Sequence, residues 1–331
     1  MAARGFGFSQ GVRASTAIAV AHATTPFITA YPWSVSGFGT KVSDPVSLPP
    51  TDCNGVAFSP SGSDIAVAGG VLANVYAYPW TTSGFGTKYS NPTGLGSNIF
   101  SVAFSPSGDT ILVGDNASSI NAYPWAPGFG SKYSDPATLP GSDGRGVTFS
   151  SSGSDVFVGT QGSPRVAAYP WSSGFGTKYA DPATLPAGSG NSVAFSTSGD
   201  VAVASAASPR VYVYPWSSGF GTKYSDPATL PTGNGNGVAF GNGVIAVAHA
   251  TTPFVSAYPW AAGFGTKYSD PASLPASTGN GVDFSSDGSA IAVAHNNSPR
   301  ITAYPWAAGF GTKFSNPATL PAGNATGVAF N

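Results

Sequence analysis

One stretch, read here from Tyr214 to Pro231, occurs seven times along the chain with small changes. Each copy contains one tryptophan, and the chain has no other tryptophan. The seven tryptophans are Trp33, Trp80, Trp125, Trp171, Trp216, Trp260 and Trp306. They follow one another at steps of 44–47 residues, and a fixed period of this length indicates a repeat architecture. The repetition therefore constrains the fold more strongly than any local pattern does.

Each repeat is expected to contain four β-strands, as the last complete copy illustrates. Apolar runs at 281–285, 290–295 and 300–304 are separated by turns rich in Ser, Asn, Gly and Pro, and 312–315 is the fourth candidate. Four strands in roughly 40–50 residues is the period of a β-propeller blade. Gly and Pro, 44 and 29 of the 331 residues, oppose helices throughout. The sequence thus predicts an all-β fold, a single seven-bladed β-propeller over residues 1–331 with a period of about 46 residues.

The two ends of the chain offer competing candidates for the strand that closes the ring. The second, third and fourth strands are predicted in seven copies, but the first has eight candidates, including residues 5–8 and 327–330. Only the C-terminal candidate matches the repeat well. Residues 327–331 are therefore expected to complete the blade that begins with residues 16–45, which would hide two sheet edges. In the alternative arrangement, residues 5–9 hold that place.

Charge is sparse and nearly balanced, with 13 basic residues against 14 acidic ones, all of them Asp. This balance provides no basic surface for phosphate groups, so no nucleic-acid partner is expected. No run approaches the ~18 apolar residues of a membrane span, and the N-terminus lacks the apolar core of a signal peptide. We expect neither membrane insertion nor a cleaved signal, and a location in a virion or outside the cell.

Parts of the repeat resemble the WD-repeat family of β-propellers. The stretch Val102-Ala-Phe-Ser-Pro-Ser-Gly-Asp-Thr-Ile111 is similar to that family's strand and turn, and Val211-Tyr-Val-Tyr214 is similar to its third strand. Tyr-Pro stands where the family has Trp-Asp, and the family's Gly-His pair is missing. The buried Asp–His–Ser–Trp network of the family therefore cannot form, and a role as a eukaryotic partner scaffold loses support.

A closer resemblance is to propeller repeats of bacterial and tailed-phage proteins, and it covers nearly the whole chain. It rests on Ala-Val-Ala-His at 19–22, Thr-Pro-Phe-Ile-Thr at 25–29 and Asn-Pro-Ala-Thr-Leu-Pro at 316–321. The resemblance implies a non-enzymatic binding or structural module, a bacteriophage virion component attached to the capsid or tail. The implied partners are other virion proteins or a host-surface protein or glycan, and no cofactor is expected.

Two other functions stay open, because a fold does not determine a function. A secreted or surface carbohydrate-binding lectin would need exposed Trp or Phe rings in repeated pockets, whereas a ring required in every repeat more simply packs between blades. An intracellular protein-interaction scaffold would bind through the loops between the second and third strands. A propeller enzyme is not expected, since Glu is absent and most Asp positions recur from repeat to repeat.

The loop between the second and third predicted strands is the candidate binding surface, because it varies where the rest of the repeat is constant. One varying position holds the large or charged side chains Phe27, Arg165, Arg210, Phe254 and Arg300. The histidines that end the second predicted strand complete the candidate set: His22, His249 and His295. Neutral drift in a tolerant loop would give the same variation. Packed sheets lie about 10 Å apart, too far for these histidines to share a metal, so neither a metal site nor a catalytic residue is predicted.

Asp283 differs from the other acidic residues because it replaces Ala or Thr inside a predicted inner strand. Most other Asp residues recur in the turns of several repeats, next to Pro or Ser. A buried, hydrogen-bonded carboxyl group is the simplest interpretation of Asp283, since buried polar groups are usually paired.

Overall fold

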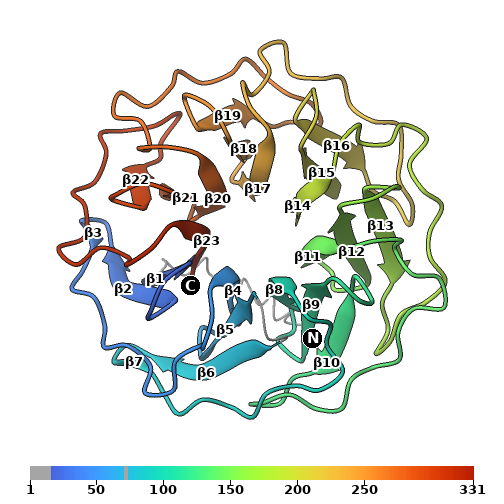
Figure 1. Cartoon of the computed structure of the whole chain (residues 1–331). Helices are drawn as coiled ribbons and strands as arrows, with labels where there is room; N and C mark the ends of the chain where they lie inside the picture. The colour runs from blue at the N-terminus through green and yellow to red at the C-terminus, as the bar shows by residue number, and fades with distance from the viewer. Residues whose placement is uncertain (1–15, 71–73) are drawn as a thin grey trace, which may run out of the picture.

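The computed structural model describes residues 16–70 and 74–331 of the chain. These residues form an all-β structure, organised as seven small antiparallel sheets of three or four strands. Figure 1 shows the sheets arranged around a common centre, with each sheet extending outward from it. Within the described ranges, no helix is long and apolar enough to cross a membrane. The expectation of an all-β fold is confirmed.

The first two sheets have four strands each. In spatial order the first contains β23 (Ala325–Phe330), β1 (Ala17–His22), β2 (Ile28–Ser34) and β3 (Gly37–Phe38). The second contains β4 (Cys53–Phe58), β5 (Asp64–Gly69), β6 (Val75–Thr81) and β7 (Gly84–Phe85). The first-named strand of each sheet lies nearest the common centre (Figure 1).

The other five sheets have three strands each. The third contains β8 (Ile99–Phe104), β9 (Thr110–Asp115) and β10 (Asn121–Pro124). The fourth contains β11 (Gly144–Phe149), β12 (Asp155–Thr160) and β13 (Val166–Pro170). The fifth contains β14 (Gly190–Phe195), β15 (Asp200–Ser205) and β16 (Val211–Pro215). The sixth contains β17 (Gly235–Gly241), β18 (Val244–His249) and β19 (Val255–Pro259). The seventh contains β20 (Gly279–Phe284), β21 (Ala290–His295) and β22 (Ile301–Pro305).

The prediction of four strands in every sheet is wrong for five of the seven. The predicted place of the fourth strand is wrong as well, because residues 312–315 form no strand and β3 and β7 lie at the Gly-Phe pair that precedes that position in the repeat. In those five the outermost pairing is a single bridge between the repeated Trp and the Phe of Gly-Phe-Gly, such as Trp216 with Phe220. The cause is the length of the connection. Trp33 and Phe38 are five positions apart, which leaves room for a two-residue ladder, whereas Trp216 and Phe220 are four positions apart.

The middle strand of every sheet is buried along its whole length. β1 and β21 both read Ala-Ile-Ala-Val-Ala-His, and all six positions are buried in each. A sheet that packs against neighbours on both faces has no polar face, so a continuous apolar run replaces the usual alternation. The hydrophobic clusters accordingly span two sheets, as Ala19 of β1 and Val67 of β5 do in one of them.

A buried tyrosine in every repeat joins neighbouring repeats. These are Tyr31, Tyr78, Tyr123, Tyr169, Tyr214, Tyr258 and Tyr304, each 0% exposed. Their hydroxyls donate hydrogen bonds of 2.6–2.8 Å to main-chain carbonyls of Thr319, Ser47, Thr93, Thr138, Thr184, Thr229 and Ser273, in the same order. Each acceptor lies in the linker between two successive sheets, so the same contact recurs at all seven interfaces.

The repeated tryptophan packs against the phenylalanine of Gly-Phe-Gly in the same repeat. The ring centroids lie 5.0–5.1 Å apart with the planes at 78–87°, an edge-to-face geometry favoured by aromatic rings. Trp33, Trp80, Trp125 and Trp260 are buried, with 6–8% of their surface exposed. These rings are packing elements and not a set of exposed stacking platforms.

The C-terminal strand belongs to the same sheet as the first described strand. β23 pairs antiparallel with β1, from Ile18 opposite Phe330 to His22 opposite Ala325. The nitrogen of Asn331 extends this pairing with a 3.0 Å hydrogen bond to the carbonyl of Ala17. β23 thus holds the innermost position of its sheet. The alternative that assigned residues 5–9 to this position concerns residues outside the described part of the chain.

We expect Tyr214→Phe to lower the free energy of unfolding by about 0.5–1.5 kcal/mol, because it removes one buried hydroxyl's hydrogen bond while keeping the ring. Equilibrium urea unfolding measures the change. Tyr268→Phe is the matched control, since Tyr268 is half-buried, its ring packs on Trp306 and the ring is kept in the variant. Equal stability losses in the two variants would contradict an interlocking role for the Tyr214 hydroxyl.

Candidate functional site

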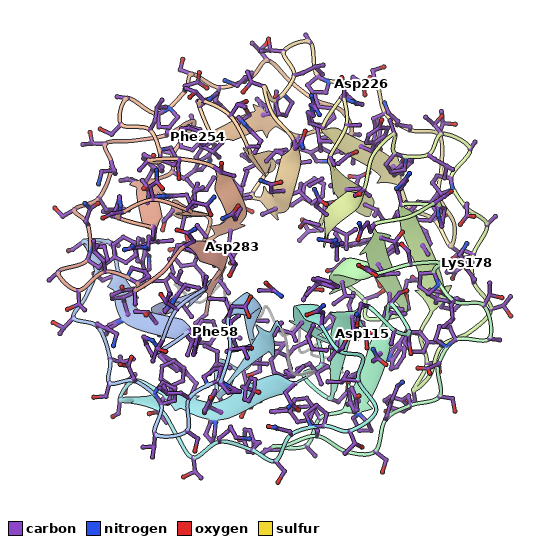
Figure 2. The ribbon with its side chains drawn as sticks, in the orientation of Figure 1. Phe58, Asp115, Lys178, Asp226, Phe254 and Asp283 are labelled. Carbon is purple, nitrogen blue, oxygen red and sulfur yellow. The ribbon has the colours of Figure 1, made fainter. Side chains whose placement is uncertain are left out.

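Three cavities follow one another along the axis that the seven innermost strands surround. At one end, a polar mouth of about 560 Å³ is lined by the second residue of every innermost strand. A narrower space of about 180 Å³ follows it. At the opposite, aromatic end lies a cavity of about 360 Å³. It is lined by residues at the fourth to sixth positions of the innermost strands, including Phe58 and Asp283. Figure 2 shows Asp283 and Phe58 close to the centre, whereas Lys178 and Asp226 lie at the periphery.

Hydrogen bonds from one strand position link neighbouring innermost strands around the polar mouth. The amide nitrogen of an Asn at the second position donates to the first carbonyl of the next innermost strand. Four such bonds of 2.6–2.9 Å run from Asn54 to Ile99, Asn191 to Gly235, Asn236 to Gly279 and Asn280 to Ala325. The hydroxyl of Thr326 donates in the same way to the carbonyl of Cys53. Each of these bonds uses one of the two N–H groups of the amide, and Asn280 uses its second on the side-chain oxygen of Asn296. The Asn side chains can therefore offer amide oxygens to the mouth.

Two adjacent sheets interrupt this series of hydrogen bonds. β8 has Phe100 and β11 has Arg145 at the position that is Asn in four other strands. The guanidinium carbon of Arg145 lies 4.7 Å from the centroid of the Phe100 ring, a cation–π contact. One side of the mouth thus combines an aromatic face with a positive charge.

Arg145 is held in place but keeps part of its hydrogen-bonding capacity. Its Nη2 donates to Oε1 of Gln161 at 2.5 Å and lies 3.8 Å from Oδ2 of Asp143. About a third of each of the two charged side chains is exposed. The Nε of Arg145 is buried and forms no hydrogen bond with any described residue. Arg145 is also the single charged side chain among the residues that line the polar mouth, so an anion entering there would meet it.

Sequence reasoning missed Arg145, although the signal is present in the repeat. When the seven copies are aligned, the residue two positions before the Val of the inner strand is Asn in four copies, Thr in one, and Phe100 and Arg145 in the others. Only the folded structure shows that these seven positions, far apart in sequence, surround one cavity.

The five loop residues predicted as a binding surface share one backbone conformation. Phe27, Arg165, Arg210, Phe254 and Arg300 each follow a cis proline and have φ of 68–78°. None of them lines the polar mouth. The guanidinium of Arg210 donates to the carbonyl of Ala206 at 2.8 Å, and that of Arg300 to the carbonyl of Pro321 at 3.1 Å. These arginines brace the loop region, and their role in binding stays a prediction.

The three predicted histidines are buried in three different sheets and do not meet. The Nε2 atoms of His22, His249 and His295 are hydrogen-bonded to the hydroxyls of Thr29, Ser256 and Thr302 at 2.8–3.0 Å. Burial lowers the pKa of each histidine to about 4, so the rings are neutral at pH 7. Across residues 16–70 and 74–331, no group of three or more His, Cys or Asp side chains is placed to hold a metal.

Asp283 is the single titratable side chain among the residues that line the aromatic end. Its Oδ2 accepts a hydrogen bond from the nitrogen of Phe330 at 2.8 Å, and its Oδ1 accepts one from the nitrogen of Phe284 at 3.0 Å. Burial raises the pKa of Asp283 to about 7, against the effect of these two hydrogen bonds. The hydrogen-bonded carboxyl group that the sequence predicts is confirmed, and it connects β20 to β23.

No protein-family model matches the chain, and no curated protein matches it in sequence. Solved structures do share its fold. A putative 6-phosphogluconolactonase from Bacteroides uniformis aligns with a TM-score of 0.76 over 96% of this chain and 100% of that one, at 11% identity. Another from Bacteroides fragilis reaches 0.70 over 97% and 99%, also at 11% identity. A functionally unknown protein from Desulfotomaculum acetoxidans reaches 0.69 over 96% and 99%, again at 11% identity.

These comparisons overturn the function that the sequence predicts. A non-enzymatic binding or structural module of a bacteriophage virion is wrong, because two solved structures with this fold carry the name of an enzyme. The prediction that the chain is not an enzyme is corrected on the same finding. In the structure the repeated rings pack against each other, and the second position of the innermost strands, which is Asn in four of seven, lines an axial cavity of about 560 Å³.

The raised pKa of Asp283 predicts a pH-dependent stability. Between about pH 4 and pH 7 the folded chain holds this proton more tightly than the unfolded chain. The stabilisation is therefore complete below pH 4 and is lost as the pH rises through 7. We expect the free energy of unfolding of Asp283→Ala to increase by about 1–2 kcal/mol relative to that of the original chain between pH 5 and pH 8. The increase is less than the full shift implies, because Asp283 is half-buried and solvent screens its charge.

Urea unfolding at a series of pH values measures this difference. Asp287→Ala is the contrasting variant, because hydrogen bonds from Ser285 and Ser289 lower the pKa of Asp287 despite its desolvation. Its stability relative to the original chain should fall as the pH rises through 4, which is the opposite direction. Parallel pH profiles for Asp283→Ala and the original chain would rule out a buried proton on Asp283.

Proposed function

We propose that the chain is a closed seven-bladed β-propeller and an enzyme that hydrolyses the lactone ring of a phosphorylated sugar acid. The single observation that carries the substrate class is Arg145, the one charged residue lining a polar mouth otherwise rich in Asn. The enzyme class is supported by the fold shared with two structures that carry a lactonase name. The role assigned to Arg145 rests on its position in this structure and not on the similar structures.

The closed ring is supported by contacts between successive sheets. Each innermost strand lies against the innermost strand of the next sheet, and β23 lies against both β20 and β4. Hydrogen bonds cross the junction on both sides of β23, from Asn280 to Ala325 and from Thr326 to Cys53. In a closed ring no sheet face is left uncovered, which suits seven sheets that are too small to be stable alone.

The polar mouth matches a phosphorylated, polyhydroxylated ligand in charge, polarity and size. A planar guanidinium binds two phosphate oxygens at once, and such charge-assisted bonds are among the strongest hydrogen bonds. The side-chain oxygens of Asn54, Asn191 and Asn236 are acceptors for sugar hydroxyls. The volume of about 560 Å³ lies within the ~300–1,000 Å³ typical of small-molecule sites.

In the proposed reaction, a water oxygen bonds to the carbonyl carbon of the lactone and the ring C–O bond breaks. The ring oxygen takes a proton and becomes a hydroxyl, and the product is an open-chain carboxylate. The second proton of the attacking water passes to solvent, and no general base is assigned, because Asp143, the carboxylate paired with Arg145 at 3.8 Å, does not line the polar mouth. Arg145 binds the phosphate and orients the lactone ring in the mouth.

We expect Arg145→Ala to raise KM for 6-phosphogluconolactone about 10–100-fold, because a charge-assisted hydrogen bond contributes about 1.5–3 kcal/mol. The phosphate-free gluconolactone should be affected less than threefold, roughly, since it lacks the group that Arg145 binds. Acid release followed in a pH-stat, corrected for spontaneous hydrolysis, measures both rates.

Lys178→Ala is the matched control, because it also removes a cation but lies at the periphery (Figure 2). Lys178 pairs there with Asp181 and does not line the polar mouth. Its kinetic constants should equal those of the original chain. The proposal is rejected if the original chain does not accelerate hydrolysis, and the assignment of Arg145 is rejected if both substrates respond equally to its loss.

A further inference from the structure

One position in the linker after each sheet is aromatic in six repeats and aliphatic in the seventh. The aromatic residues are Tyr89, Tyr133, Tyr179, Tyr224, Tyr268 and Phe314. Val42 holds the corresponding place after the first sheet, as the alignment of Lys41-Val42-Ser43 with Lys88-Tyr89-Ser90 shows. The backbone is the same at both, since Val42 donates its N–H to Ala30 and Tyr89 donates its own to Ala77.

The six aromatic rings make the same packing contact. Each packs edge-on against the tryptophan of an adjoining sheet, with centroids 4.9–5.3 Å apart and planes at 85–89°. The tryptophan at the interface where Val42 stands is Trp80. Its aromatic neighbours among the described residues are Phe58 and Phe85. Both positions hold Phe in every repeat. Trp80 therefore lacks the third ring that the other six tryptophans have.

The missing ring leaves a cavity of about 350 Å³ between the first two sheets. Val42, Trp80 and Pro32 form its apolar wall. Ser61, Ser63, Thr81 and Asn331 are among the polar residues at its edge. An apolar cavity of about 150 Å³ already suffices to bind benzene in an engineered protein. The space is therefore large enough for a ring.

Two glycines confirm that the cavity lies where the ring is expected. A Cβ atom built on Gly37 would meet the ring of Phe314 at 3.0 Å, and one built on Gly84 would meet the side chain of Val42 at 3.2 Å. Gly37 and Gly84 are equivalent positions of the repeat, preceding Phe38 and Phe85. Val42 thus enters the space that Phe314 fills, but with a much smaller side chain.

We propose that this cavity is a binding site for one aromatic ring of a small phenolic molecule. The ring takes the edge-on place against Trp80 that tyrosine takes at five other interfaces. The phenolic hydroxyl faces the hydroxyl and amide groups at the edge of the cavity. This site lies between the first two sheets, away from the residues of the polar mouth, and its existence does not depend on the proposed lactonase activity.

Titration of the full chain with 4-fluorophenol, followed by fluorine NMR, tests the proposal. We expect one saturable site at millimolar concentration in the original chain. Val42→Phe should fill the cavity, weaken binding at least tenfold and raise Tm, because a ring then packs on Trp80 as Phe314 packs on Trp33. Val46→Phe is the matched control, since Val46 is fully exposed and does not line the cavity, and it should bind like the original chain.

A second variant tests the same site by gain of binding. Tyr133 packs on Trp171 at 5.2 Å, so Tyr133→Val should open a corresponding cavity and double the number of bound probe molecules. Absence of saturable binding to the original chain overturns the proposal. Equal binding by the original chain and by folded Val42→Phe overturns it as well, because the probe would then occupy another place.

Discussion

Seven tyrosine hydroxyls hold successive repeats together, and the arrangement of the sheets depends on this contact. Each sheet has only three or four short strands and cannot cover both of its faces alone. The hydroxyl of one repeat binds a carbonyl in the linker before it, which brings the next apolar face into register. Because the same bond recurs at every interface, it sets a uniform spacing between sheets. That spacing determines the width of the axial cavities where the candidate site lies.

The candidate site lies where the chain departs from its own repeat. Asn54, Asn191, Asn236 and Asn280 each bind the neighbouring strand, whereas Phe100 and Arg145 do not provide this bond to β11 and β14. A hydrogen bond of this kind contributes about 0.5–1.5 kcal/mol. Two of the seven possible hydrogen bonds between innermost strands are therefore absent. They are absent at adjacent strands, where the Phe100 ring and the Arg145 charge line the mouth. Local losses of stability are common at functional positions.

Periodicity alone predicts the all-β fold and the succession of apolar strands, because every sheet solves the same packing problem. The outer strands are mispredicted in place, since the pairing falls on Gly-Phe and not on residues such as 312–315. They are mispredicted in number because one residue more or less between Trp and Phe decides between a ladder and a bridge. The loop arginines looked free in sequence, but Arg210 turns back to a carbonyl of its own loop. Arg145 could not be found without the fold, since nothing local indicates that seven distant strand positions face one cavity. A resemblance between repeats reflects this shared scaffold and carries little information about the site.

The pairing of β23 with β1 has a consequence for the synthesis of the protein on the ribosome. Ala21 of β1 lies opposite Gly327 of β23, a residue 306 positions later in the sequence (327 − 21). At translation rates of ~5–20 residues per second, β1 emerges roughly 15–60 s before the strand that completes its sheet. During that interval an apolar edge is available to other nascent chains or to chaperones. The order of synthesis thus places the greatest risk of aggregation on the first sheet, and the pairing of β23 with β1 removes it.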